Sequence, residues 1–171
     1  MVAHSELALL PRVEQVSDLH CVTTWSYCRI RWGGYRFCDA YERLFLPRVK
    51  PHREARWVMV RGAGGHRASL LLDDALVPDV LLADQMNGEA LSFEHGGPLR
   101  LITPSHYAYK SVKHLTGIEF WSEFKPGPGL LEDPRARVAL EERGRWMPGR
   151  LLRYLYRPLI APVTRHSRVP G

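Results

Sequence analysis

The amino-acid sequence predicts an α+β domain, a mixed and β-rich fold with short helices. Two observations lead to this class. Alternating and β-branched residues recur in short runs, and 14 glycines and 13 prolines supply many turns between them. The helical stretches do not alternate regularly with the strands, which argues against a doubly wound parallel sheet. With 171 residues, 45% of them hydrophobic, the chain can form one globular domain with an appendage.

The N-terminal part is expected to form short elements that end at glycine or proline. Residues 5–10 predict a helical piece, because the proline that follows cannot continue a helix. Residues 12–25 alternate and are rich in β-branched side chains, which predicts a strand that runs into a loop. A glycine pair predicts a turn within residues 31–37. A helix is expected over residues 40–45, because Asp39 is a favourable N-cap and a proline follows.

The central part predicts further strands joined by tight turns. Residues 56–60 and 67–72 are strand-like runs around a glycine-rich turn, which predicts a hairpin. Asn87 and the glycine after it form a tight-turn signal. Two more strands are expected at residues 99–103 and 117–121.

A change in composition predicts a domain boundary near residue 125. The Lys-Pro-Gly-Pro-Gly run predicts a linker over residues 125–131. We therefore expect the main domain over residues 1–124 and a basic, helical extension over residues 132–171. Two helices are expected in this extension, at residues 133–143 and 149–160.

The positive charge of the chain is concentrated at its C-terminal end. Of the 24 Lys and Arg residues, seven lie from Arg143 onward without any acidic residue, which leaves 17 basic against 18 acidic groups before it. The neutral body argues against a nucleic-acid-binding fold, so no nucleic-acid partner is expected. Residues 149–160 intermix Leu, Tyr and Arg. This leaves open a helix packed on the body and a surface helix that contacts a membrane or a redox partner.

The sequence gives three indications about the compartment. No apolar run approaches the roughly 20 residues that a bilayer-spanning helix needs. The N-terminus lacks the basic and then apolar pattern of a signal peptide. The three cysteines at positions 21, 28 and 38 cannot all pair, and a chain of this size needs no disulfide framework. We therefore expect a reducing, cytoplasmic location.

Cys21 is the first candidate functional residue, and several roles are open to it. The three cysteines contain no CxxC spacing, which argues against a zinc site. In a strand, His20 would point to the opposite face from Cys21, so this neighbour would not serve as the base of a cysteine nucleophile. A buried core cysteine and a soft metal held by one thiolate with non-protein ligands both remain open.

Basic side chains form a second candidate site. His95, Arg100, Lys110 and Lys113 fall within 19 residues, and two glycines after His95 allow a close approach of the backbone. Arg100 offers a planar fork for a phosphate, and the lysines offer point charges. Because Arg100 lies in an apolar run, the pattern favours a phosphate-bearing ligand over a solvated surface. Neither GxGxxG nor GxxxxGK[ST] is present.

Three ordered stretches resemble the molybdopterin-binding oxidoreductase domain of the sulfite oxidase type. They are HCVTTWS at 20–26, RWGGYRFCD at 31–39, and a long stretch at 79–113 that includes MNGEAL and HGGPLR. This family includes plant nitrate reductase and the bacterial protein-methionine-sulfoxide reductase. The resemblance covers roughly residues 6–122 and is strongest to short bacterial single-domain members. It implies a sulfite-oxidase-type fold that is N-terminally shortened, because relatives carry a strand and a loop before the equivalent of Ser5.

The resemblance assigns roles to individual residues. It implies that Cys21 ligates molybdenum and tunes the metal, which makes it the catalytic and metal-binding residue. The residues expected to hold molybdopterin are His95, Arg100, Lys110, Ser111, Val112 and Lys113. The residues expected on the substrate side are Thr23, Thr24, Trp25 and Arg31.

The activity that the resemblance implies is oxygen-atom transfer to or from a small oxyanion or sulfoxide-type substrate. The chain has no heme or flavin motif, so a separate electron-transfer partner is expected. Sulfite oxidases carry Cys-Ala-Gly-Asn-Arg-Arg at the metal ligand, whereas this chain has Cys-Val-Thr-Thr-Trp from Cys21. Sulfite is therefore not singled out as the substrate. The alternative is a degenerate, non-catalytic domain of the same fold that no longer holds the cofactor.

Overall fold

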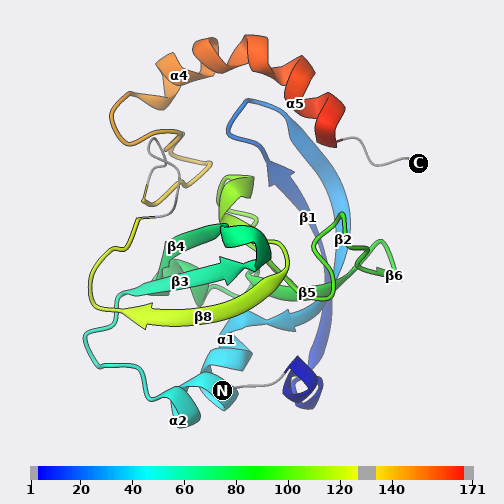
Figure 1. The fold of residues 1–171 in the computed structure, drawn as a ribbon, viewed down its shortest axis with the longest axis vertical. Helices are drawn as coiled ribbons and strands as arrows, with labels where there is room; N and C mark the ends of the chain where they lie inside the picture. The colour runs from blue at the N-terminus through cyan, green and yellow to red at the C-terminus, as the bar shows by residue number, and fades with distance from the viewer. Residues whose placement is uncertain (1–3, 127–133, 168–171) are drawn as a thin grey trace.

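The structure, a computed structural model, describes residues 4–126 and 134–167. Its described strands form two antiparallel sheets, shown in Figure 1. The first sheet has the order β1-β2-β5-β6, with β7 also paired to β5, and the second has the order β4-β3-β8. The two sheets with short helices between the strands confirm the predicted α+β class.

The elements have the following bounds. The strands are β1 (Arg12–His20), β2 (Ser26–Arg36), β3 (Trp57–Gly62), β4 (Arg67–Leu71), β5 (Leu81–Met86), β6 (Glu89–Ala90), β7 (Arg100–Ile102) and β8 (Leu115–Trp121). The α-helices are α1 (Phe37–Ala40), α2 (Leu46–Val49), α3 (Leu72–Ala75), α4 (Gly149–Tyr156) and α5 (Ile160–Ser167). The remaining helical turns are η1 (His4–Leu9), η2 (Tyr41–Phe45), η3 (Ala63–Gly65), η4 (Ala108–Lys110) and η5 (Arg157–Leu159). Within the described ranges, none of these helices has the length and apolarity needed to cross a membrane.

Both sheets contribute to the main core, and the first sheet also buries its other face. Val58 of β3 and Leu70 of β4 pack in one cluster with Leu82 of β5. The neighbours of Leu82 in the strand, Leu81 and Ala83, belong to a second cluster. This alternation is the period-two pattern of a strand that is covered on both faces.

The turn predicted at residues 31–37 is wrong, because Gly33 and Gly34 lie inside β2. A Cβ atom on Gly34 would lie 2.2 Å from the carbonyl oxygen of Leu82 in β5. The register between β2 and β5 shifts between the two glycines. The pair therefore allows two strands to approach closely at a β-bulge, a role that the sequence pattern does not distinguish from a turn.

The helix predicted for residues 40–45 is longer than expected at both ends. Helical structure runs through α1, η2 and α2, with Arg36 in place of Asp39 as the N-cap residue. Pro47 directly follows the π-helical turn η2, in which the N–H of Leu46 donates to the carbonyl of Tyr41, and the run continues past the proline. It ends at Lys50, whose φ of 46° is left-handed.

The C-terminal segment differs from the prediction in its first part. Residues 134–148 form turns and irregular structure, so the helix predicted for 133–143 is wrong over its described residues. The helix predicted for 149–160 is present and continues through η5 and α5 (Figure 1). The predicted linker at 125–131 falls mostly outside the described residues.

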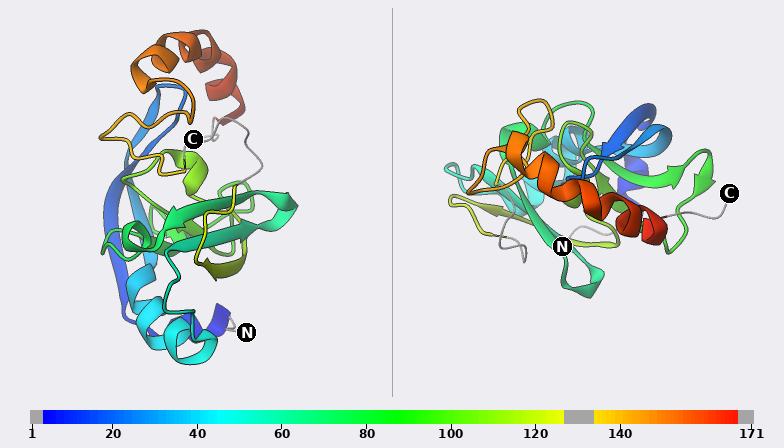
Figure 2. Two further views of the ribbon diagram at one scale, coloured as in Figure 1. Left: turned by 90° about the vertical axis from the view of Figure 1, so that its left-hand side faces the viewer. Right: turned by 90° about the horizontal axis from the view of Figure 1, so that it is seen from above.

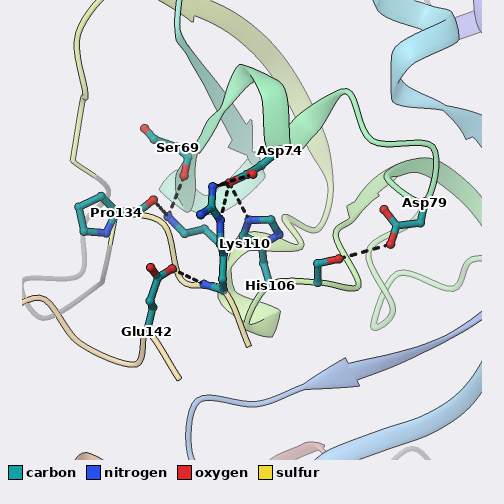
Figure 3. A network of polar contacts seen from close by, with 9 residues as sticks. Ser69, Asp74, Asp79, His106, Lys110, Pro134 and Glu142 are labelled. Atoms are coloured by element: carbon teal, nitrogen blue, oxygen red, sulfur yellow. Dashed lines mark hydrogen bonds and ion pairs between the residues drawn. The ribbon is translucent and has the colours of Figure 1, made fainter. Parts of the chain in front are cut away.

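Polar contacts anchor the C-terminal segment on the body (Figure 3). The guanidinium of Arg137 donates to both carboxylate oxygens of Asp74, at 2.9 and 3.0 Å. The buried ammonium of Lys110 donates to the carbonyl oxygens of Ser69, at 2.7 Å, and Pro134, at 3.0 Å. Because buried ammonium groups need such partners, the C-terminal segment completes the packing of the body.

Candidate cofactor cavity

A cavity of about 750 Å³ opens among segments that are far apart in the sequence. The β1–β2 hairpin, the β3–β4 turn, the β5–β6 turn and residues 95–114 all contribute to its wall. This volume falls in the range of cofactor and small-molecule sites. The lining residues that the sequence predicted for the site are Cys21, Trp25, His95, Arg100, Ser111 and Lys113.

A tight loop between β1 and β2 presents the Cys21 thiol to this cavity. The N–H of Cys21 donates to the carbonyl of Trp25 at 2.8 Å, and the N–H of Thr24 donates to the carbonyl of Cys21 at 3.1 Å. Thr24 has a φ of 74°, a left-handed conformation that β-branched residues rarely adopt. The sulfur of Cys21 lies 3.0 Å from the hydroxyl oxygen of Thr23. The thiol therefore sits on a compact turn and contacts a neighbouring hydroxyl.

The C-terminal segment reaches this Cys21 loop, here defined as residues 21–25. The guanidinium of Arg143 donates to the carbonyl oxygen of Val22 and stacks 4.9 Å from the ring centre of Tyr107. Tyr107 also forms an isolated β-bridge with His20, the residue before the loop. The loop is thus fixed from outside by a residue more than 100 positions later in the chain.

Arg100 lies on β7, where its guanidinium is buried and its positive charge is not compensated. Its guanidinium donates to the carbonyl oxygens of His95, at 2.8 Å, and Ser111, at 3.4 Å, and lies 5.1 Å from the ring centre of Trp32. Arg100 forms no ion pair with any residue of the described ranges. Burial lowers the pKa of Arg100 to about 10, which still leaves it charged at neutral pH. A buried cation without an anion favours an anionic ligand.

Two glycines let the loop after His95 pack closely, Gly96 against Lys113 and Gly97 against Leu91. Gly96 has a φ of 98°, and a Cβ atom there would lie 2.8 Å from the Cβ and Cγ atoms of Lys113. A Cβ atom on Gly97 would lie 2.2 Å from the carbonyl oxygen of Leu91. The predicted close approach of the backbone is therefore made to protein atoms, and the Gly96 contact positions Lys113 at the cavity wall.

The local field of this wall is positive. Burial, followed by the charges of Lys113 and Arg100, lowers the pKa of His95, so its imidazole is neutral at neutral pH. Burial and the charge of Arg100 also lower the pKa of Lys113, whose ammonium donates to the carbonyl of Glu94 at 2.6 Å. An anion bound here would relieve the repulsion among these groups.

The other predicted residues do not line the cavity. Arg31 is exposed and is bonded to Asn87 at the β5–β6 turn, and Val112 is buried in the main core. Lys110 directs its ammonium to backbone carbonyls, as described above. Thr23 and Thr24 belong to the Cys21 loop, where they shape the turn.

Sequence reasoning missed four aromatic residues of the lining, Tyr27, Trp32, His66 and His114. Trp32 lies in one of the three matched stretches. The turn predicted there gave no reason to expect that it is buried in β2. His66 lines the cavity from the end of the β3–β4 turn and bonds through Nε2 to the carbonyl of Tyr109. His114 bonds through Nδ1 to the carbonyl of Gly97. The spacing of the two histidines in the sequence does not indicate a shared site, because they come together only in the folded chain.

The residues present fit an anionic, acceptor-rich group such as molybdopterin. Buried nitrogen atoms of Trp25, Trp32 and Arg100, all of them lining residues, have no hydrogen-bond partner. Unpaired buried donors of this kind indicate a missing acceptor. No group of three or more His, Cys, Asp or Glu residues within the described ranges could hold a metal ion. Cys21 therefore offers a single soft ligand, which suits a metal whose other ligands come from its cofactor.

Comparison with protein families agrees with this chemistry. Residues 2–128 match the model described as the oxidoreductase molybdopterin binding domain. The chain belongs to this family. The match confirms the resemblance drawn from the three sequence stretches, and it places Cys21 and residues 95–114 inside the family domain while Arg143 lies beyond it.

The curated proteins that are similar to this chain carry several different enzyme names. The uncharacterized oxidoreductase YuiH of Bacillus subtilis (strain 168) is 39% identical over 127 residues, which cover 74% of this chain and 62% of YuiH. The sulfite oxidase of Arabidopsis thaliana is 35% identical over 114 residues, covering 60% of this chain and 29% of that protein. The protein-methionine-sulfoxide reductase catalytic subunit MsrP of Ralstonia nicotianae is 27% identical over 135 residues, covering 70% and 39%. The chain thus spans less than two thirds of the length of each.

A solved structure supports the fold. The sulfane dehydrogenase SoxCD from Paracoccus pantotrophus superposes with a TM-score of 0.61 at 20% identity. The superposition covers 80% of this chain and 40% of the SoxCD chain. The two chains therefore share the sulfite-oxidase-type fold.

Proposed function

We propose that this chain is a molybdenum-cofactor-dependent oxidoreductase whose cavity holds molybdopterin, with Cys21 as the protein ligand of the metal. The bound group would supply two-electron oxygen-atom transfer to or from a small oxyanion or sulfoxide-type substrate. One observation carries the proposal above all. The cavity brings the Cys21 thiol together with a buried, uncompensated Arg100 and with Lys113, although about 80 residues separate the thiol from the cations.

Each of these side chains has a defined part in holding the group. Arg100 and Lys113 would bind its phosphate, because their charges lack an opposing carboxylate within hydrogen-bonding distance among the described residues. A neutral His95 can donate or accept one hydrogen bond to the pterin without adding charge. Trp25 and Trp32 offer unpaired indole N–H donors, and their rings exclude water from the lining.

The substrate side is built differently from that of a sulfite oxidase. The residues after Cys21 supply hydroxyl and aromatic groups and no cation, and Arg31 is held by Asn87 away from the lining. We therefore keep the substrate class open between small oxyanions and sulfoxides. A separate electron-transfer partner completes the proposal, which accords with a relative named as a catalytic subunit.

Metal content tests the proposal directly. The full chain, produced in a host that makes molybdopterin, should carry about one molybdenum per chain, because the cavity offers one soft ligand. Cys21→Ser should lose the metal. Cys28→Ser is the matched control, because Cys28 is an exposed cysteine of β2 and should leave the metal content unchanged. Metal content and dye-linked oxidation or reduction of sulfite and sulfoxides would be measured on the same samples.

The outcomes separate the proposal from its alternative. Folded wild-type protein without molybdenum or pterin would favour a non-catalytic domain of the same fold. Equal metal loss in the Cys21 and Cys28 variants would contradict the assigned role of Cys21.

A further inference from the structure

The helical run from α4 through α5 leaves an apolar stripe uncovered. Leu151, Leu155 and Leu159 are spaced four residues apart, which places them on one side of the helix. Their exposed fractions are 54%, 57% and 45%, and neighbouring Tyr154 is 60% exposed. Among the side chains of α4, Leu152 alone is buried, at 7% exposed. The helix therefore packs on the body through a narrow contact and shows most of its apolar surface to solvent.

Arginines form the polar face of the same helical run. Arg150, Arg153 and Arg157 recur at intervals of three and four residues, so they share the polar face, on the side of the helix away from the leucines. Arg153 lies 3.5 Å from Glu141, but Arg150 and Arg157 form no ion pair within the described ranges. No acidic residue follows Glu142 in the sequence. The surface thus combines exposed leucine and tyrosine with positive charge that the chain itself does not neutralise.

We propose that the apolar stripe, together with the arginines of the polar face, docks this protein on an anionic lipid surface. A helix that lies in the membrane interface buries leucines in the acyl boundary, while arginine side chains extend to lipid phosphates. The arginines accompany the stripe along the whole helix and are not focused at one point, which suits a plane of headgroups better than a single acidic patch on a protein. Docking of this kind needs no helix that spans the bilayer.

The helical run lies near the Cys21 loop, so membrane docking would also affect where the cavity sits. Figures 1 and 2 show α4 and α5 across one end of the molecule, beside the tip of the β1–β2 hairpin. Arg143, just before α4, bonds to Val22 in the Cys21 loop. Docking would therefore hold the Cys21 loop close to the membrane surface. The proposal itself does not depend on the metal or on the proposed function.

Vesicle sedimentation of the full chain tests the docking proposal. The protein should bind vesicles of phosphatidylcholine mixed with phosphatidylglycerol, bind weakly to phosphatidylcholine alone, and be released by added salt. Leu151→Ser with Leu155→Ser should abolish most of the binding. Arg150→Gln with Arg157→Gln should weaken it roughly 25-fold, about five-fold for each arginine removed near the surface.

Matched controls distinguish vesicle binding by the helical run from non-specific binding through net charge or through any exposed apolar side chain. Arg43→Gln with Arg53→Gln removes the same charge from exposed positions elsewhere, and Leu9→Ser removes a leucine that is 76% exposed. Both controls should bind vesicles like the wild type, and all variants should keep the thermal unfolding midpoint of the parent.

Three results would overturn the proposal. Equal loss of binding in the charge control would indicate unspecific attraction. Equal binding of the leucine variant would exclude the apolar stripe. Self-association in ultracentrifugation that the leucine variant removes, without vesicle binding, would assign the stripe to a contact between copies of the chain.

Discussion

The Cys21 loop and the 95–114 segment line the same cavity, but the protein holds them in different ways. Arg100 is buried among backbone carbonyls and Trp32, and Gly96 and Gly97 pack against neighbouring backbone and side-chain atoms. The Cys21 loop is a hairpin tip, and Arg143 donates a hydrogen bond to it from outside the hairpin. The cationic wall is thus fixed by the core, whereas the thiol depends on a short turn and on the C-terminal segment.

This difference indicates how the two halves of the site respond to change. Substitutions that change the packing of a wall that is part of the core cost stability, because the surrounding atoms are close-packed. A loop at a hairpin tip can be altered at small cost to the fold, because few buried contacts depend on it. We therefore expect changes in residues 95–114 to affect folding, and changes near Cys21 to affect the geometry of the thiol.

The largest effect is expected from Gly97→Ala in the cationic wall. Its Cβ atom would meet the carbonyl oxygen of Leu91 at 2.2 Å, so backbone must shift, and the free energy of unfolding should fall by about 3 kcal/mol. Gly117→Ala is the control, because its Cβ atom would lie 4.0 Å from the nearest atoms of Arg61. Chemical denaturation measures both, and equal stabilities would contradict the assignment of this wall to the core.

A smaller effect, located in the loop, is expected from Arg143→Ala. The carbonyl of Val22 loses its charged donor and Tyr107 loses its stacked guanidinium, which should cost about 1–2 kcal/mol. Amide hydrogen exchange should accelerate within residues 21–25 and stay unchanged within 95–102, which Arg143 does not contact. Arg145→Ala removes an exposed arginine two positions away and should change neither. Faster exchange throughout the chain would refute a local role.

An opposite sign is expected from Arg100→Met in cofactor-free protein. Removal of a buried, unpaired charge should outweigh the loss of two hydrogen bonds to carbonyls, so the free energy of unfolding should rise by about 1 kcal/mol. The same variant should lose molybdenum when produced with cofactor. Arg36→Met, at an exposed position, should change neither quantity. A destabilised Arg100 variant that keeps its metal would show that Arg100 acts only in the fold.

The smallest effect is expected from the titration of His95. Because its folded-state pKa lies below the unfolded value of 6.5, the unfolded chain binds the proton more tightly, and this residue lowers stability as the pH falls below 6.5. Burial is the main cause, followed by the charge of Lys113, so Lys113→Met should raise the pKa of His95 in NMR titrations. Lys125→Met is the control. An unchanged pKa of His95 in the Lys113 variant would show that the charge of Lys113 does not influence the titration of His95.

Much of the site could be predicted from local sequence. Cys21 and Arg100 were singled out by residue type and surroundings, and both line the cavity. Lys110 could not be distinguished from Lys113 in the same way, since both are lysines in one basic stretch. One ammonium is buried against the carbonyls of Ser69 and Pro134, and the other reaches the cavity. Only contacts across more than 20 residues decide between them.

The sequence alone determined the fold class, the family stretches and the cysteine and arginine of the site, because these are written in residue types and short spacings. Tertiary structure decided what distant segments do to one another. It placed Gly33 and Gly34 inside a strand, since β5 approaches there too closely for a side chain. It gave residues 134–143, the described part of the helix predicted for 133–143, an irregular structure, since the body offers hydrogen bonds to their backbone, as Tyr107 does to Ala136. Local sequence patterns contain no information about such distant partners.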